Sequence, residues 1–387
     1  MKRIAAIQEK LVRYAIGLTA DSACLGVDAA LVRIKGSGPE MLIKVVKDKH
    51  FRHPPGLQNR LLAARRSARD LAVLSFELGT EMAEVVLGLQ EWAQSENIEV
   101  DFVASPGYTV AHIPTRGAES AAGRLAIGDP NVIASQTGLP VVSDFAAADM
   151  AVGGQGNVLH PYADWVLFSR PDRVSACLHL GGYASLTIVT PELHEVVAFD
   201  VGPCLASIDS SVRLLTHATQ TRDRDGAIAG KGLVIDEFLE YLLSHPYFAR
   251  VPPKSTSHDE FGPEEYLRDA LNGRRDHSLE DMLATVTMAV GYSITRAFSR
   301  FVYPSHSVSR LILSGEGLHN RTLMRNVKTG IKEAVVRKTD RYGIPCNVVD
   351  PLSACILGSE AFFGNPTNLP SATGAKRQVT TGRITMP

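Results

Sequence analysis

The chain has 387 residues, of which 45% are hydrophobic and 21% charged, the values of an ordinary globular protein that is long enough for two domains. Its 40 Lys and Arg residues nearly balance 41 Asp and Glu residues, so no overall positive field favours nucleic acid or an anionic membrane. The five cysteines lack CxxC spacing and no apolar run is long enough for a signal peptide or a membrane span, which predicts a cytoplasmic protein.

The first third of the chain predicts one α/β unit. Short apolar, β-branched runs predict strands at residues 14–18, 27–34 and 42–46. Apolar residues at helical spacing then predict a long helix over residues 70–94, and a strand follows at residues 97–104. We expect a first domain of residues 1–135, completed by residues 365–387 as an extended tail or an edge strand.

A second α/β unit is predicted over residues 136–364. Its expected strands cover residues 141–144, 165–168, 176–180, 185–189, 196–199, 310–314 and 347–349. Its expected helices cover residues 205–217, 232–244, 263–271, 279–303 and 320–336. Several of these strands run into Gly or Asp before a helix, and open α/β sheets place ligand sites at such carboxyl ends.

Eight short motifs carry a family resemblance. They are IGDPNVIA (127–134), VSDFAAADMAVGGQG (142–156), LHLGGYASL (178–186), AFDVGPC (198–204), DRDGAIAGKG (223–232), SHPYFARVPPKST (244–256), LILSGEGLHNRTLM (311–324) and NLPSATGA (368–375). In this order and spacing the chain resembles the anhydro-N-acetylmuramic acid kinase family from about Tyr14 to the tail. The resemblance implies the two-domain actin-like ATPase fold of the sugar kinase/Hsp70/actin class, α/β with a cleft between the domains. It also implies an enzyme that uses ATP, Mg²⁺ and water to open the 1,6-anhydro ring of a muramic acid sugar and phosphorylate O6.

Asp200 matches the catalytic base of that family. An Asp directly after a buried strand and before Gly-Pro is well placed to deprotonate a water that attacks an anomeric carbon. The alternative from the residues alone is that Asp200 caps a following helix.

The resemblance assigns further residues to the two ligands. Glycines let backbone N–H groups approach phosphate oxygens, and the residues matched to nucleotide or phosphate binding are Ser22, Gly26, Gly181, Gly182, Gly315 and Gly317. The residues expected to line the substrate cleft are Tyr108, Thr109, Asp144, Asp149, Gln155 and Tyr183.

The chain departs from the family pattern at both ends of the expected cleft. In the first phosphate loop, residues 20–26, a glycine is replaced by Asp21 and a metal-side carboxylate by Leu25. On the sugar side, polar residues are replaced by Tyr108, Ala146 and Ser353. These changes predict a drier pocket, and its expected lining is Leu25, Tyr108, Tyr183, Val201 and Leu205.

Three functions stay open on the sequence. The first is an anhydro-sugar kinase that depends on ATP, and the second is a catalytically silent pseudokinase that acts as a scaffold or regulator. The third is an enzyme that uses Asp200, Asp144 or Asp149 on a less polar substrate without ATP.

Partners follow from the same considerations. We expect a small molecule in the interdomain cleft, a homodimer by resemblance, and neither nucleic acid nor membrane.

His112, His160, His179 and His217 lack a shared metal-ligand spacing, so no metal site is expected among them. The run at residues 254–256 is expected to be a loop with a helix cap, although it could touch a nucleotide.

Overall fold

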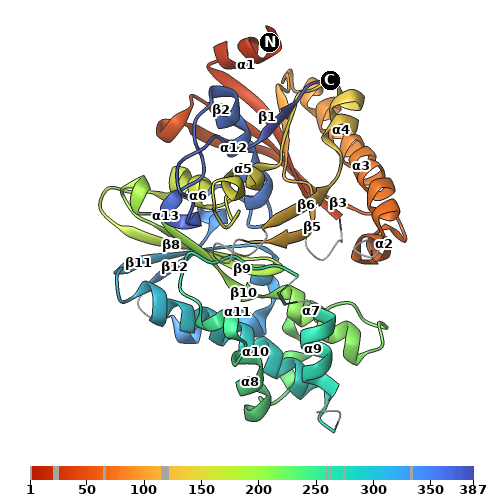
Figure 1. Ribbon diagram of the computed structural model, residues 1–387, viewed down its shortest axis with the longest axis vertical. Coiled ribbons are helices and arrows are strands. Elements are labelled where there is room, and N and C mark those ends of the chain that lie inside the picture. The colour runs from red at the N-terminus through yellow and green to blue at the C-terminus, as the bar shows by residue number, and fades with distance from the viewer. Residues whose placement is uncertain are drawn as a thin grey trace.

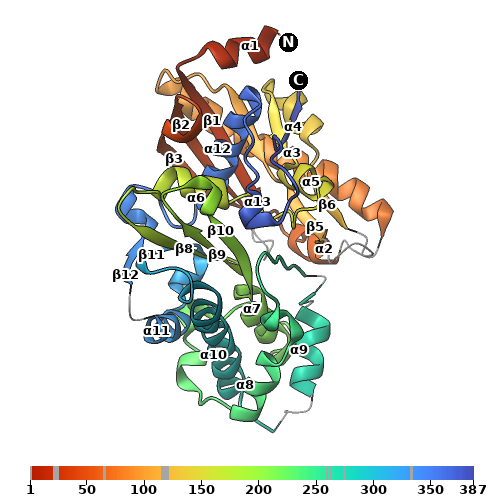
Figure 2. The same cartoon turned by 60° about the vertical axis from the view of Figure 1, so that its left-hand side comes forward.

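Two mixed β-sheets form the centre of the computed structural model (Figure 1). The structure describes residues 2–20, 26–63, 67–114, 122–258, 260–261, 263–272, 276–331 and 334–387. Figures 1 and 2 show an elongated molecule with the first sheet in its upper half, helices α7–α11 in its lower half and the second sheet between them. Both termini lie at the upper end. The predicted α/β architecture is confirmed.

The first sheet has six strands in the order β13-β7-β4-β1-β2-β3. Their bounds are Val12–Ala20 (β1), Gly26–Lys35 (β2), Leu42–Arg52 (β3), Phe102–Ser105 (β4), Val141–Ser143 (β7) and Arg383–Thr385 (β13). β1 runs antiparallel to β2 and parallel to β4, and β13 closes the other edge antiparallel to β7. The predicted edge strand in the tail is therefore confirmed. β7 belongs to this sheet although it follows residue 135, and the predicted domain boundaries stay a prediction.

The second sheet has five strands in the order β10-β9-β8-β11-β12. Their bounds are Val174–Leu180 (β8), Tyr183–Val189 (β9), Val197–Pro203 (β10), Val308–Ser314 (β11) and Val335–Lys338 (β12). A separate hairpin pairs β5 (Tyr108–Ile113) with β6 (Gly123–Ile127). β11 pairs parallel with β8 and β12, so the carboxyl ends of β8 and β11 lie at the same edge of the sheet. Gly181 and Gly182 follow β8 at this edge, and Gly315 and Gly317 follow β11.

The helices cover both faces of both sheets. Their bounds are Lys2–Glu9 (α1), Leu57–Ala63 (α2), Ala68–Ser95 (α3), Pro130–Thr137 (α4), Phe145–Ala151 (α5), Pro161–Phe168 (α6), Leu205–Leu215 (α7), Asp236–Leu243 (α8), Pro263–Asn272 (α9), Leu279–Ala297 (α10), Arg321–Gly330 (α11), Val349–Phe363 (α12) and Pro370–Thr373 (α13). A π-helical turn, Phe298–Val302, extends α10. In the part of the chain that the structure describes, no helix combines the length and the apolar character needed to span a membrane.

The alternation of side chains along the strands sends each strand's apolar residues into two cores. On β1, Ile16 and Leu18 pack with the buried face of α3, while Ala15 faces α12 on the other side of the sheet. α3 is N-capped by Ser67, whose hydroxyl accepts a hydrogen bond from the backbone N–H of Asp70. The predicted long helix is therefore confirmed, and it covers one face of the first sheet.

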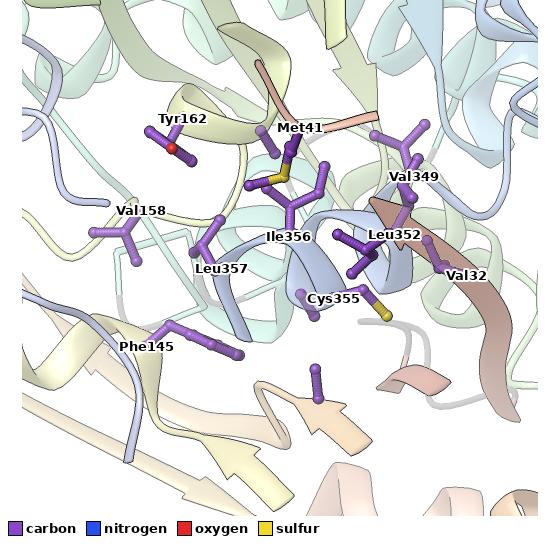
Figure 3. Close-up of a cluster of buried hydrophobic side chains, with 14 of the residues drawn as sticks. Val32, Met41, Phe145, Val158, Tyr162, Val349, Leu352, Cys355, Ile356 and Leu357 are labelled. Carbon is purple, nitrogen blue, oxygen red and sulfur yellow. The ribbon is translucent and has the colours of Figure 1, made fainter. Parts of the chain in front are cut away.

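α12 lies at the centre of a large core, which it shares with α6 and with one face of each sheet (Figure 3). Figure 3 shows Leu352, Cys355 and Ile356 of α12 among side chains from other elements, including Met41 and Phe145. Cys177 of β8 and Ile312 of β11 belong to the same core, so the two sheets are joined by one apolar layer.

Two strand predictions in this layer are wrong. Residues 165–168, expected as a strand, form the second half of α6, and the strand expected at 347–349 is replaced by the start of α12 at Val349. The helix expected over 320–336 ends at Gly330, and β12 follows from Val335. Apolar runs this short fit a buried helix as well as a strand, and here packing between the two sheets decides for the helix.

Candidate functional site

Asp200 lies in the middle of β10, and three donors hold its side chain. Its Oδ1 accepts a hydrogen bond from Asn157 Nδ2 at 2.8 Å. Its Oδ2 accepts from Ser255 Oγ at 2.7 Å and from the backbone N–H of Thr256 at 2.9 Å. Asp200 is 8% exposed, and its carboxylate makes none of the hydrogen bonds that would cap α7, whose N-cap position is Cys204. The helix-cap alternative for Asp200 is therefore wrong.

Burial and hydrogen bonding act on Asp200 in opposite directions. Loss of solvent raises the pKa of Asp200, while the hydrogen bonds from Thr256 and Ser255 and the charge of Lys254 lower it, and the result is a pKa of about 6. At neutral pH the group is thus an ionised carboxylate with its pKa close to the working pH. This is the condition under which a carboxylate serves well as a general base.

Lys254 lies next to this carboxylate in a ring of aromatic side chains. Its Nζ donates to Tyr247 O at 3.2 Å and lies 4.4 Å from the centre of the Tyr247 ring and 5.0 Å from that of Phe301. Burial lowers the pKa of Lys254 to about 8, although Asp200 opposes the change. Tyr247 also donates its hydroxyl to the backbone oxygen of Asp200 at 2.6 Å. Tyr247 therefore holds both the Lys254 ammonium group and the backbone of Asp200.

A chain of hydrogen bonds connects Asp200 to β5. Because Ser255 donates its only hydroxyl proton to Asp200, the contact between His112 Nε2 and Ser255 Oγ, 3.1 Å long, needs His112 as the donor. Ser257 Oγ donates to the backbone oxygen of His112 at 2.7 Å and fixes the same segment against β5. Within the predicted run at residues 254–256, Ser255 and Thr256 therefore orient the carboxylate.

Thr109 and Asp144 meet at a second place, through Arg124. Arg124 donates from Nη2 to Thr109 Oγ1 at 3.1 Å and from Nη1 to Asp144 Oδ1 at 3.3 Å. Asp144 has a left-handed backbone conformation with φ 55°, which is uncommon for a residue other than glycine and is typical of functional or strained positions. Arg124 has no distinctive sequence context, and only the fold reveals its link to these two residues.

Asp149 and Gln155 hold the GGQG loop to the C-terminal segment. The Asp149 side chain is fully buried, and its oxygens accept hydrogen bonds from Gly156 N, Asn368 Nδ2 and Thr373 Oγ1 at 2.7–2.9 Å. A Cβ at Gly154 would lie 2.1 Å from Asp149 Oδ2, so only glycine fits there. The backbone N–H of Gln155 donates to Thr373 O. These contacts make Asp149 a residue that positions the loop.

The glycines at 181 and 182 form the turn between β8 and β9, with Tyr183 as the first residue of β9. The carbonyl oxygens of Gly181 and Gly182 accept hydrogen bonds from backbone N–H groups at the start of α7. A Cβ added at Gly181 would meet nothing nearer than Tyr183 O at 3.7 Å. The turn therefore leaves room for a group such as a phosphate beside its backbone.

The other predicted phosphate-loop glycines have structural reasons for being glycine. A Cβ at Gly315 or Gly317 would lie within 2.7 Å of Leu180, where the turn after β11 crosses the end of β8. A Cβ at Gly26 would lie 2.0 Å from Phe51 O in the neighbouring strand. Ser22, together with Asp21 and Leu25, lies outside the described residues.

The predicted apolar lining is only partly found around one cavity. This small cavity lies next to Lys254, and its lining includes Val201, Phe248 and Phe301. Tyr108 is 8% exposed and belongs to the core under α3. Neither Tyr108 nor Tyr183 lines the cavity.

Comparison with known proteins gives one family across the chain. The family model described as "Anhydro-N-acetylmuramic acid kinase" matches residues 13–387. The curated anhydro-N-acetylmuramic acid kinase of Salinibacter ruber is 35% identical over 400 residues, with 100% of both chains covered. That of a Bacillus cereus strain is 34% identical over 385 residues, covering 97% of this chain and 99% of its own. A solved activator of 2-hydroxyisocaproyl-CoA dehydratase from Clostridium difficile is 12% identical with a TM-score of 0.43, covering 90% of this chain and 96% of that one.

Proposed function

The chain belongs to the anhydro-N-acetylmuramic acid kinase family, and we propose that it opens the ring of a 1,6-anhydro amino sugar and phosphorylates O6 at the expense of ATP. The observation that carries this proposal is the Asp200 carboxylate, which is buried, held by three donors and has a pKa of about 6.

Asp200 supplies the proton acceptor of this reaction. A carboxylate offers about four acceptor positions, and three of those of Asp200 are used by Asn157, Ser255 and Thr256. The fourth, on Oδ1, suits a water. In the proposed step this water gives a proton to Asp200 as its oxygen attacks the anomeric carbon, and the bond from that carbon to O6 breaks. O6 then takes the γ-phosphoryl group of ATP, whose bond to the β-phosphate oxygen breaks to release ADP.

The residues present fit the nucleotide in part. The Gly181-Gly182 turn has space for a phosphate beside Gly181. Mg²⁺ takes oxygen ligands, and Leu25 offers none at the position where the family resemblance expects a carboxylate. Residues 20–26 therefore do not fit a metal loop of that kind, and no step is assigned to the ion.

A second candidate, a silent scaffold or regulator, is favoured by Asp21 and Leu25 in the expected phosphate loop. Asp21 would place a negative charge near a triphosphate, which costs several kcal/mol at about 4 Å in a poorly solvated site. The homodimer and the cytoplasmic location stay predictions and bear on neither candidate.

One assay separates the candidates. The full chain is incubated with Mg·ATP and 1,6-anhydro-N-acetylmuramic acid, and the product is expected to gain the mass of one phosphoryl group and one water. Calorimetry that detects nucleotide binding without turnover would favour the scaffold. Conversion of another sugar without ATP, lost on changing Asp200, would favour the third, ATP-independent enzyme.

The pH dependence of the reaction is the first testable prediction. Because the base must be ionised, kcat/KM is expected to rise with pH, to be half-maximal near the Asp200 pKa of about 6 and to fall below it. The acid limb is measured with saturating ATP between roughly pH 5, below the Asp200 pKa of about 6, and pH 8, the approximate pKa of Lys254. An acid limb that stays flat through this range would contradict the assignment of Asp200 as the base.

The hydroxyl of Ser255 sets part of that pKa. In Ser255→Ala the carboxylate loses a donor that favours its charged form, so the acid limb is expected to move to higher pH. Ser257→Ala is the matched control, since Ser257 donates to the backbone of His112, and it should leave the midpoint unchanged. A Ser255→Ala profile that coincides with the wild type would show that this hydrogen bond does not tune the base.

A further inference from the structure

Three potential metal ligands meet where the N-terminus of α6 approaches the end of β8. They are His160, Asp164 and His179, and the ligand atoms of all three lie within 4.8 Å of one another. His160 directly precedes α6 with helical backbone angles, so Asp164, four residues later, lies on the same face of the helix. The third group comes from β8, which the sequence alone could not place beside α6.

Asp164 and His179 are in direct contact and almost without solvent. His179 Nε2 lies 2.8 Å from Asp164 Oδ2, and the two side chains are 7% and 0% exposed. The other ring nitrogen, Nδ1, contacts Ser314 Oγ at the end of β11. When Nδ1–H donates to this hydroxyl, Nε2 turns a lone pair toward the carboxylate. A cation bound by both atoms satisfies them once this 2.8 Å pair opens to the wider separation of metal ligands.

Two buried polar atoms of the cluster have no hydrogen-bond partner among the residues that the structure describes. They are Asp164 Oδ1 and His160 Nδ1. A buried carboxylate oxygen without a partner is costly. Since the second atom belongs to the same small cluster, both point to a ligand at this place.

We propose that His160, Asp164 and His179 bind a divalent transition metal ion of the Zn²⁺ class. Two imidazoles and one carboxylate form a donor set typical of such ions, whereas Mg²⁺ prefers oxygen donors alone. The positive ion offsets the buried charge of Asp164, and binding releases the proton that otherwise lies between His179 and Asp164.

His160 must move for this geometry to form. Its ring is stacked on that of His179 with centroids 3.9 Å apart and planes 16° from parallel, and a metal in the plane of one ring is then out of the plane of the other. The His160 side chain is 12% exposed and its Nε2 lies 3.3 Å from Oδ1 of Asp350, whose side chain is 55% exposed. Nδ1 is then the ring nitrogen left for a metal, and Asp350 is close enough to Nε2 to serve as an outer partner.

The location gives the ion a structural role. His179 lies two residues before the Gly181-Gly182 turn, and Ser314 directly precedes Gly315. A metal held between α6 and β8 fixes this end of the second sheet to the core that both sheets share. This inference is independent of the proposed kinase activity.

The test uses the full chain stripped of metal with a chelator and titrated with Co²⁺, which reports tetrahedral nitrogen and oxygen ligation by its visible absorption. One equivalent is expected to bind, and Zn²⁺ should displace it. Asp164→Asn and His179→Gln should each weaken Co²⁺ binding by at least about 10- to 100-fold, the loss typical even for outer partners of a metal site. His50→Gln is the matched control, because His50 also pairs with a carboxylate, Asp28, at 2.9 Å, and it should bind Co²⁺ as the wild type does.

His160→Gln guards against a variant that fails to fold, since it leaves the buried pair of Asp164 and His179 intact. It should weaken binding while the chelator-treated protein keeps the thermal midpoint of the wild type. Absence of saturable Co²⁺ binding in the wild type, or equal affinity in all four variants, would overturn the proposal and leave a metal-free hydrogen-bonded cluster.

Discussion

Asp200→Asn is expected to lower the rate of ring opening and phosphorylation by about 10²- to 10⁴-fold, the usual contribution of a general base. An amide at this place cannot take the proton of the attacking water. Its oxygen can still accept from Ser255 and Thr256, and the Asn157 amide can turn its own oxygen toward the new NH₂ group, so the fold should persist. The rate is measured as ADP release that depends on the anhydro sugar.

Asp101→Asn is the matched control for this change. Asp101 is also buried, at 6% exposure, and accepts hydrogen bonds from Lys10 Nζ and from the backbone N–H of Tyr14. It directly precedes β4, at the amino end of that strand and away from the carboxyl ends where ligands are expected. Its substitution should cost stability and leave the rate of the folded protein unchanged. Equal rates for wild type and Asp200→Asn would remove Asp200 from the mechanism, even if the chain proves to be a kinase.

Gly17→Ala is expected to destabilise the protein by about 3 kcal/mol or more, at or beyond the upper end of the usual cost of overpacking. Here α12 crosses β1 so closely that a Cβ at residue 17 would lie 1.9 Å from Pro351 O and 2.9 Å from Cys355 Sγ. The nearest obstacle is backbone, so a side-chain rotation cannot relieve it. Chemical unfolding monitored by circular dichroism gives the change in free energy of unfolding.

Gly88→Ala is the same substitution at an open position, and it is expected to stabilise the protein where Gly17→Ala destabilises it. Gly88 is exposed in α3, and a Cβ there meets no atom within 4 Å. The added methyl group should stabilise the helix by about 0.5–1 kcal/mol, because glycine is the poorer helix former. If both variants unfold at the same denaturant concentration, the close crossing of α12 over β1 is not as described.

Most strands of the two sheets could be predicted because each shows a short apolar run with turn residues around it, whereas β12 lies where the expected helix over 320–336 was extended too far. α12 could not be predicted in the same way. Twelve of its 15 residues are buried, so it lacks the polar face that produces a 3.6-residue period. The short run at its start, residues 347–349, fits a strand equally well, and only the packing between two sheets decides against it.

The candidate site was predictable at its centre and not at its edges. Asp200 could be found because it lies in a family motif, although the strand expected to end just before it continues through it to Pro203. Asn157 and Ser255, which hold it, come from segments 43 and 55 residues away, and no local pattern joins them. The spacing of His160 and Asp164 was visible in the sequence, but His179 joins them only through the position of β8 against α6. The sequence predicted no metal site among these histidines because it does not show the contact between β8 and α6.

The core around α12 also limits how the molecule can move. Because this helix packs against one face of the first sheet while α6 and the second sheet complete the same apolar layer, the two halves cannot swing apart without exposing it to water. A change in their relative orientation that keeps this layer packed is a shear movement, in which packed helices slide over small distances. Where α12 passes over Gly17, two backbones lie too close for even a methyl group, so this crossing leaves little room for the helix to slide.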